Sequence, residues 1–291
     1  MTYQQLYREL LPHYEEGEAK AVVRLLLEEV FNLSFTDILS GKLDDLSEAE
    51  SQKLTAMMDR LRGGEPVQHV VGTATFMGRR FVVGPEVLIP RPETEELCRI
   101  ILDRYNRPYC GLQPPEPTSV LDIGTGSGCI AVTLALDLWN CSASGWDISG
   151  DALLMARENA LRLGAQVNWE LHDVLHLEDD KPQPASYDII VSNPPYICDR
   201  ERVDMEPRVL LHEPATALFV PDDNPLLFYH AIAQMAADAL RPGGLLAFEI
   251  NPLYADLLST NLQTTGWQQV EILNDPFGKQ RFILAHKNGR A

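Results

Sequence analysis

The sequence predicts an α/β protein whose larger domain is built on a mostly parallel β-sheet and is preceded by a small helical domain. Three observations predict this fold. Apolar strand-like runs alternate with helical segments after residue 117, a glycine-rich turn follows the first of these runs, and the first 70 residues show only helical periodicity. A chain of 291 residues is long enough for both domains. We expect them to span residues 1–70 and 91–291, with a β-hairpin linker over 71–90.

Composition and charge exclude several classes of protein. A hydrophobic content of 45% allows a sizeable core, so a disordered or fibrous chain is not expected. No run reaches the roughly 18 apolar residues of a membrane span, and the acidic start lacks an apolar signal segment. We therefore expect a cytoplasmic protein that binds no membrane. With 24 Lys and Arg against 42 Asp and Glu, the formal net charge is -18, which disfavours direct binding of nucleic acid through a basic face.

Cysteines and histidines give no sign of a metal site. The five cysteines are odd in number and form no Cys-x-x-Cys pair, so neither a disulfide framework nor a zinc ribbon is expected. His172 and His176 are four residues apart but have no third ligand at metal-binding spacing. We therefore expect no metal.

The first 70 residues are predicted to be helical. Apolar positions at spacings of three and four indicate helices over 3–11, 17–31 and 47–62, and Ser47 opens the last of them with a capping-box pattern. This stretch carries 13 acidic and 7 basic side chains and no chemical motif. It serves either the stability of the chain or the docking of a partner.

The chain is then predicted to form a hairpin followed by a helix. β-branched and aromatic residues flank Gly78 over 73–83, as in a two-stranded hairpin. Pro90 and Pro92 prevent regular structure in the next segment, and a helix resumes over 93–106.

The larger domain is predicted from alternating strands and helices, which form a parallel sheet through right-handed crossovers. The expected strands are Ser119–Ile123, Ala143–Asp147, Gln166–Leu171, Tyr187–Ser192 and Gly244–Ile250. The expected helices lie near 128–139, 150–163, 224–241 and 252–265, with Gly164 and the pair Gly243-Gly244 at two helix ends. The segments Gln268–Leu273 and Arg281–His286 are expected to form an antiparallel pair at one edge of the sheet.

A glycine-rich turn, Asp122-Ile-Gly-Thr-Gly-Ser-Gly, ends the first of these strands and opens a helix. Its third glycine comes too early for a dinucleotide fingerprint, no Gly-Lys-Ser/Thr follows as in a P-loop, and Ser127 does not lie in a nucleophile elbow. The pattern resembles the first motif of class I S-adenosyl-L-methionine (SAM) methyltransferases. We expect SAM to be bound by Asp122 and by the loop residues Gly124, Thr125, Gly126, Ser127 and Gly128.

Carboxylates at the ends of the next two strands fit the same ligand. Asp147 ends the strand over 143–147, where its carboxylate can accept hydrogen bonds from both ribose hydroxyls; capping of the following helix is the alternative. Asp173 closes the third strand, and Val174 beside it can pack on the adenine ring. The anionic Asp122 and Asp147 suit the cationic sulfonium of SAM, which carries no phosphate that would call for basic residues.

The tetrapeptide Asn193-Pro-Pro-Tyr ends the fourth strand. Each proline lacks an N–H and extends the residue before it, so this corner is rigid and displays acceptor atoms. The side-chain oxygen of Asn193, which also faces the cofactor, and the carbonyl of Pro194 can accept from one –NH2 group, while Tyr196 offers a flat face for stacking. We predict that Asn193, Pro194 and Tyr196 direct the lone pair of an amide or aromatic amine toward the sulfonium methyl group.

With these motifs the chain resembles the release-factor glutamine methyltransferases (the PrmC/HemK family) over nearly its whole length. The matching segments are Phe76-Met-Gly with Phe81, Val87-Leu-Ile-Pro-Arg-Pro-Glu-Thr-Glu, Asp122-Ile-Gly-Thr-Gly-Ser-Gly, Ser192-Asn-Pro-Pro-Tyr-Ile and Glu213-Pro-x-x-Ala-Leu. The resemblance implies an N-terminal helical domain, a hairpin and a seven-stranded methyltransferase domain of the class I, Rossmann-like fold. It also implies methylation of the glutamine side-chain amide in the Gly-Gly-Gln motif of peptide chain release factors.

The resemblance also assigns the binding of the substrate glutamine. It places this side chain at Asn193, Pro194, Pro195 and Tyr196, with Arg91 and Thr94 on the neighbouring wall. The acidic helical domain would then dock the release factor, which is expected to present basic surfaces.

The chain departs from the family pattern at two points, and other functions stay open. Val174 stands where an aromatic residue is common, and Glu249-Ile-Asn stands where Gly-x-x-Gln is common. The alternatives are methylation of adenine, cytosine or another protein glutamine, and a SAM-binding scaffold without catalysis. DNA adenine methyltransferases share only the Asn-Pro-Pro-Tyr motif.

Overall fold

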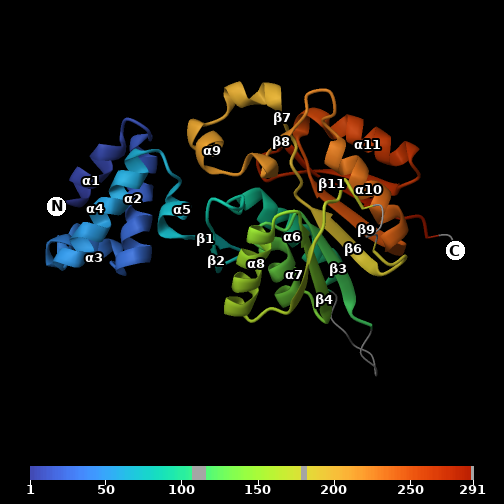
Figure 1. Cartoon of the computed structure of the whole chain (residues 1–291), viewed down its shortest axis with the longest axis horizontal. Helices are drawn as coiled ribbons and strands as arrows, with labels where there is room; N and C mark the ends of the chain where they lie inside the picture. The colour runs from blue at the N-terminus through green and yellow to red at the C-terminus, as the bar shows by residue number, and fades with distance from the viewer. Residues whose placement is uncertain (107–115, 178–181, 290–291) are drawn as a thin grey trace. The chain divides into compact units, whose positions relative to one another are not determined.

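A computed structural model describes residues 1–106, 116–177 and 182–289 of the chain (Figure 1). The chain forms two compact units, each of which is considered by itself. Unit 1 comprises Met1–Thr73, Val83–Pro85 and Met205–Glu213, and unit 2 comprises Ala74–Val82, Glu86–Asp204 and Pro214–Ala291. In the described part of the chain, every helix is too short or too polar to cross a membrane.

Unit 1 is a helical bundle with its own apolar core. Its helices are α1 (Tyr3–Leu10), α2 (Glu16–Phe31), α3 (Phe35–Leu39), the 3-10 helix η1 (Lys42–Asp45), α4 (Glu48–Arg62), α5 (Val67–Val71) and α9 (Pro207–His212). The three predicted helices are confirmed as α1, α2 and α4. The capping box of α4 is also confirmed, because Ser47 Oγ accepts from the Glu50 N–H and the Glu50 carboxylate accepts from the Ser47 N–H.

Helix α9 belongs to unit 1 although it is far from the other helices in sequence. The Arg208 guanidinium carbon lies 4.8 Å from the centre of the Tyr14 ring, and its Nη1 lies 2.8 Å from Glu18 Oε1. The sequence patterns did not predict this helix. Its six residues are too few to show a convincing helical periodicity.

Unit 2 is built on a seven-stranded sheet in the order β10-β11-β9-β6-β3-β4-β5. The strands are β3 (Thr118–Ile123), β4 (Cys141–Asp147), β5 (Val167–Leu171), β6 (Tyr187–Ser192), β9 (Leu240–Glu249), β10 (Gln268–Asn274) and β11 (Gln280–His286). Strand β11 pairs antiparallel with both β9 and β10, and all other pairs are parallel. The structure therefore confirms the predicted fold class.

Two short sheets complete the strands of the described chain. β1 (Thr73–Phe76) and β2 (Arg79–Val82) pair on either side of Gly78, as predicted, and Gly78 has a φ of 72° in this tight turn. β7 (Ile197–Cys198) and β8 (Phe219–Val220) pair in parallel, which was not predicted. Three short 3-10 helices are η2 (Asp199–Asp204), η3 (Ala215–Ala217) and η4 (Pro252–Tyr254).

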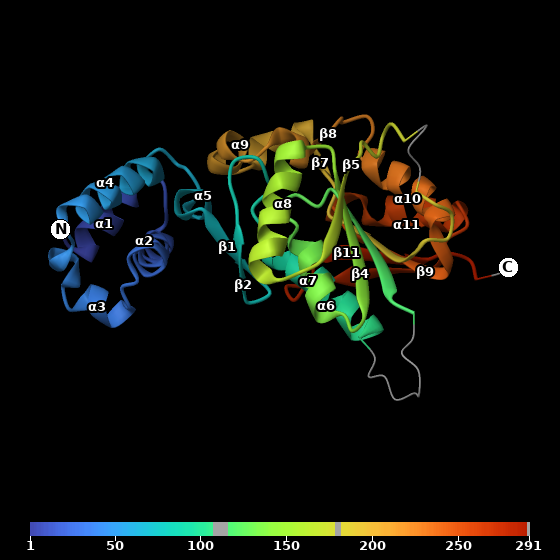
Figure 2. The ribbon, with the colours of Figure 1, turned by 60° about the horizontal axis from the view of Figure 1, so that its bottom comes forward.

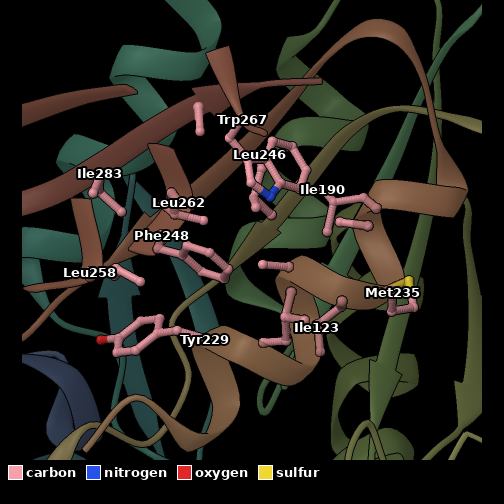
Figure 3. Packing of buried hydrophobic residues seen from close by; sticks show 14 of the residues in the cluster. Ile123, Ile190, Tyr229, Met235, Leu246, Phe248, Leu258, Leu262, Trp267 and Ile283 are labelled. Atoms are coloured by element: carbon pink, nitrogen blue, oxygen red, sulfur yellow. The ribbon is translucent and has the colours of Figure 1, made fainter. Parts of the chain in front are cut away.

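Helices cover both faces of the large sheet (Figure 2). The first face packs against α6 (Pro92–Tyr105), α7 (Cys129–Asp137) and α8 (Gly150–Leu163), and the second against α10 (Leu227–Ala239) and α11 (Ala255–Thr264). Alternating residues of β9 serve the two layers, since Leu245 and Ala247 join the first while Leu246 and Phe248 join the second. Figure 3 shows this second layer, in which Phe248 packs beside Tyr229 of α10.

The predicted helix end at Gly243-Gly244 is wrong. Helix α10 ends at Ala239, and the two glycines lie inside the span of β9. The Gly243 N–H donates to the Lys287 carbonyl, and the Gly244 carbonyl accepts from the Lys287 N–H. A Cβ at position 244 would lie 3.0 Å from the Arg241 carbonyl oxygen, so a close backbone approach requires this glycine. Gly164, with a φ of 76°, does end α8 as predicted.

Candidate active site

The carboxyl ends of the neighbouring parallel strands β6, β3, β4 and β5 surround a cavity of about 350 Å³. Strand order reverses between β3 and β6, and ligands of open α/β sheets bind at such a switch point. Asn193 follows β6, the glycine loop follows β3, Asp147 ends β4 and Asp173 follows β5. The strand ends thus bring together residues as far apart in sequence as Gly124 and Asn193, which are separated by 69 positions.

The three glycines of the loop have two different roles. Gly124, Gly126 and Gly128 all have positive φ, at 70°, 54° and 79°. A Cβ added to Gly124 or Gly126 would meet no atom within 4 Å, and both residues line the cavity, so their lack of a side chain leaves room for a ligand. A Cβ on Gly128 would lie 2.9 Å from the Trp169 ring and 3.0 Å from Ala156 Cβ, so this glycine is needed for packing.

Asp147 holds the loop and lines the cavity. Its Oδ2 accepts from the Gly126 N–H at 2.8 Å, and its Oδ1 accepts from the Ser149 N–H at 2.9 Å. Each oxygen has a further lone pair for a ligand hydroxyl. Burial raises the pKa of Asp147, and these backbone hydrogen bonds oppose the shift. The N-cap of α8 is Ser149, whose hydroxyl accepts from Ala152, so helix capping is not the task of Asp147.

Asp122 supports the loop from behind the cavity wall. Its side chain is fully buried, and its Oδ2 accepts from the Thr125 hydroxyl at 2.5 Å and from the Ala131 N–H at 3.2 Å. Burial raises its pKa to about 7. Thr125 and Ser127 line the cavity, whereas Asp122 is not among its lining residues in the described chain.

Part of the cavity lining is apolar, and the Asp173 carboxylate also contributes to the lining. Val174 lines the cavity together with Ile148 and Phe228. Asp173 also lines it, where its Oδ1 accepts from the Leu175 N–H and its Oδ2 lies 2.6 Å from His176 Nδ1. The branched aliphatic side chain of Val174 thus contributes apolar surface to the cavity.

The rigid corner after β6 reaches the cavity with three of its four residues. Asn193, Pro194 and Pro195 line the wall, but Tyr196 does not do so among the described residues. The Tyr196 ring packs against the cluster beneath α10 and α11, and its hydroxyl donates to Glu249 Oε1 at 3.1 Å. Burial raises the pKa of this tyrosine.

The start of α6 forms a part of the cavity wall that adjoins this corner. The N-cap Arg91 is extended, Pro92 occupies the first helical position, and both Arg91 and Thr94 line the cavity. The Thr94 hydroxyl donates to Glu249 Oε2 at 2.6 Å, and Asn193 Nδ2 donates to Thr94 Oγ1 at 3.2 Å.

The sequence motifs did not assign a role to Glu249, which stood out only as a departure from the family pattern. One feature of the sequence could have marked Glu249 as a site residue. Glu249 is an ionisable residue directly after the apolar run Leu245–Phe248, at the end of a strand that borders the switch point. The structure buries it against the two hydroxyl groups of Thr94 and Tyr196.

The sheet order, the glycine loop after β3 and the carboxylate ending β4 define a class I methyltransferase fold. The chain matches the PrmC N-terminal domain over residues 3–72 and a methyltransferase domain over residues 116–251. It belongs to the release factor glutamine methyltransferase family.

Curated relatives of that name align with almost the whole chain. The protein of Bacteroides thetaiotaomicron is 42% identical, over 94% of this chain and 95% of its own length. That of Bacillus subtilis is 36% identical over 94% of each chain, and that of Neisseria gonorrhoeae is 37% identical over 91% of this chain and 92% of its own.

Solved structures share the fold at lower identity. A methyltransferase from Pyrococcus furiosus is 16% identical with a TM-score of 0.50, and the match covers 80% of this chain and 99% of that one. The T. thermophilus 16S rRNA N2 G1207 methyltransferase is 20% identical with a TM-score of 0.50, over 74% of this chain and 50% of that one. These similarities concern the fold alone.

Proposed function

We propose that this protein transfers a methyl group from SAM to the side-chain amide nitrogen of the glutamine in the Gly-Gly-Gln motif of peptide chain release factors. The observation that carries the proposal is the position of Asn193 and Pro194, which line the same cavity as the glycine loop after β3. Membership of the family supports it, because relatives named release factor glutamine methyltransferase align over nearly the whole chain.

The cavity fits SAM in size and in chemistry. Its volume of about 350 Å³ falls within the range of small-molecule sites. Gly124 and Gly126 leave open space beside the backbone, Asp147 offers acceptors to a ribose diol, and Val174 with Ile148 offers apolar surface to an adenine ring. When bound, SAM supplies a methyl group activated by a positively charged sulfur. Asp122 would act on this site through the loop that it holds.

Asn193 and Pro194 would hold the substrate amide. A carboxamide nitrogen is a weak nucleophile because its lone pair is delocalised into the carbonyl group. Asn193 Oδ1 and the Pro194 carbonyl would accept its two N–H groups and so direct the lone pair toward the methyl group. The same acceptors would stabilise the positive charge that develops on nitrogen as the N–C bond forms and the S–C bond breaks. The surplus proton then leaves the nitrogen for solvent.

Unit 1 would dock the release factor. The first 70 residues have an acidic excess of 13 to 7 and a separate apolar core that keeps their helices in place. A basic partner would be attracted to such a surface from a distance.

Because release factors act on translating ribosomes, we propose that the protein works in the cytoplasm.

The test uses SAM labelled in its methyl group. The protein is incubated with a release factor, with the same factor carrying Gly-Gly-Ala, and with DNA. We expect label on the first substrate alone, and mass spectrometry should place one methyl group on the glutamine side-chain nitrogen. Label on the Gly-Gly-Ala factor, on DNA or on another atom would overturn the proposal.

A further inference from the structure

A buried carboxylate is connected to both ends of the rigid corner Asn193-Pro-Pro-Tyr196. Glu249, the last residue of β9, is 1% exposed. Its Oε1 accepts from the Tyr196 hydroxyl at 3.1 Å, and its Oε2 accepts from the Thr94 hydroxyl at 2.6 Å. Thr94 in turn accepts from Asn193 at 3.2 Å. Tyr196 is therefore held directly, and Asn193 is held through Thr94.

The Thr94 hydroxyl determines which way the Asn193 amide faces. A hydroxyl has one proton to donate, and a carboxylate can only accept. Once Thr94 has donated its proton to Glu249, its oxygen can only accept from Asn193, so the amide must turn its Nδ2 toward Thr94. The opposite orientation would place two oxygens against each other with no proton between them. Asn193 Oδ1 is thus directed away from Thr94 and kept available to a substrate amine.

The burial of Glu249 supports a role beyond stability. Taking a carboxylate out of water is unfavourable, and an apolar residue of similar size would avoid that penalty. Burial accordingly raises the pKa of Glu249, while the two hydroxyl donors and the charge of Arg281 on β11 oppose the shift. A charged acceptor also binds a hydroxyl proton more firmly than a neutral one.

We infer that Glu249 is a positioning residue for methyl transfer, which fixes the amide orientation of Asn193 through Thr94 and anchors the other end of the corner through Tyr196. The inference rests on the proposed function, because it assigns Asn193 Oδ1 to the substrate amide. If so, turnover depends on the proton that the Thr94 hydroxyl donates to Glu249, although the Glu249 carboxylate does not itself line the cavity.

The first experiment compares Thr94→Val with Thr94→Ser. Valine keeps the shape of threonine but removes the hydroxyl, so kcat should fall about 10- to 100-fold, the range found when a residue that orients a metal ligand is removed. The Kd for SAM should stay unchanged. Serine keeps the hydroxyl and should restore most of the lost kcat. Thr133→Val is the matched control, because Thr133 is fully buried in α7 and its hydroxyl has no hydrogen-bond partner in the described chain.

Glu249→Gln tests the carboxylate itself. Glutamine keeps the size of the side chain but has one oxygen, so only one of the two hydroxyls can still donate to it as before. We expect kcat to fall with the melting temperature close to that of the wild type. A Glu249→Gln protein that is as fast as the wild type would overturn the inference.

A measurement without substrate completes the test. In the wild type, the side-chain NH2 signals of Asn193 in 15N NMR should show slow exchange with water, because one proton is bound to Thr94; in Thr94→Val they should shift and exchange faster. Unchanged signals, wild-type kcat in Thr94→Val, or no recovery in Thr94→Ser would each overturn the inference. Failure of the wild type to methylate glutamine would instead overturn the proposed function, and the NMR result would still decide the orientation of Asn193.

Discussion

The backbone N–H of Gly126 donates to Asp147 Oδ2 at 2.8 Å, which connects the loop after β3 to the end of β4. The other carboxylate oxygen accepts from the Ser149 N–H at 2.9 Å, at the start of α8. One side chain therefore shapes the loop and also faces the cavity. A substitution of Asp147 changes both the loop and the surface offered to a ligand.

Asp147→Ala should weaken SAM binding by about 10- to 100-fold, which corresponds to the loss of hydrogen bonds to a charged group. Asp147→Asn should weaken it less, because an amide oxygen can still accept from one backbone N–H. Calorimetry on both variants gives the two affinities, with circular dichroism as the control for folding. An unchanged affinity in Asp147→Ala would contradict the ribose assignment.

Asn193→Ala should lower kcat by at least about 100-fold, as expected on removal of one preorganised polar contact to a developing charge. SAM binding should change little, because the loop after β3 and Asp147 are untouched. Single-turnover rates and SAM affinity, measured on the same preparation, separate the two effects. A variant that turns over like the wild type would be incompatible with the proposed mechanism.

Substitution of Gly126 and of Gly128 by alanine should have different effects. Both residues have positive φ, a conformation that costs an alanine about 1–2 kcal/mol. Gly128→Ala also pushes a Cβ against Trp169 and Ala156, and such overpacking adds about 1–3 kcal/mol, so urea unfolding should show it as the less stable variant. Gly126→Ala should mainly weaken SAM binding, because its Cβ enters the cavity. Equal stabilities would contradict this division.

Stability should depend on pH through Asp122. Burial raises its pKa from 3.8 to about 7, so the folded protein keeps this proton up to about pH 7 while the unfolded chain loses it near pH 4. Between these values the folded state binds more protons, and the free energy of unfolding therefore falls as the pH rises. Asp122→Asn, which stays neutral, should flatten this decline. The free energy of unfolding of the wild type and of Asp122→Asn is measured by urea unfolding at several pH values from about 4 to 8. Parallel pH profiles of the two proteins would contradict a role of Asp122 in this pH dependence.

Binding of a release factor should weaken with salt. The formal net charge of -18 gives long-range attraction to a basic partner, and salt screens such attraction over about 10 Å at 0.1 M. Association rates measured by stopped flow between low and moderate ionic strength should fall, while dissociation rates change less. Association that is independent of ionic strength would show that the acidic surface has no part in docking.

The positions of the glycine loop, Asp147, Asp173 and Asn193 could be predicted from the sequence. Each follows an apolar run that reads as a strand, and parallel strands present their carboxyl ends at one edge of the sheet. Local patterns were therefore enough to bring these residues together without knowledge of the strand order.

The surroundings of Tyr196 and Glu249 could not be predicted in this way. Their contact depends on β9 lying beside β6, although Ser192 and Leu240 lie 48 positions apart in sequence, and strand order is a property of the whole sheet. Prediction of α9, β7 and β8 failed for another reason. These elements have two to six residues, too few for a periodic pattern to appear.

Because of the strand order, two halves of the sheet contribute different parts of the cavity lining. In the proposed function, the residues that would bind SAM lie mainly at the ends of β3, β4 and β5, whereas those that would surround the methyl acceptor lie at the ends of β6 and β9 and at the start of α6. Residues of one half can therefore be substituted while those of the other half are left unchanged. A mutant library confined to the segments after β6 and β9 would search for new methyl acceptors and leave the residues proposed to bind SAM unchanged.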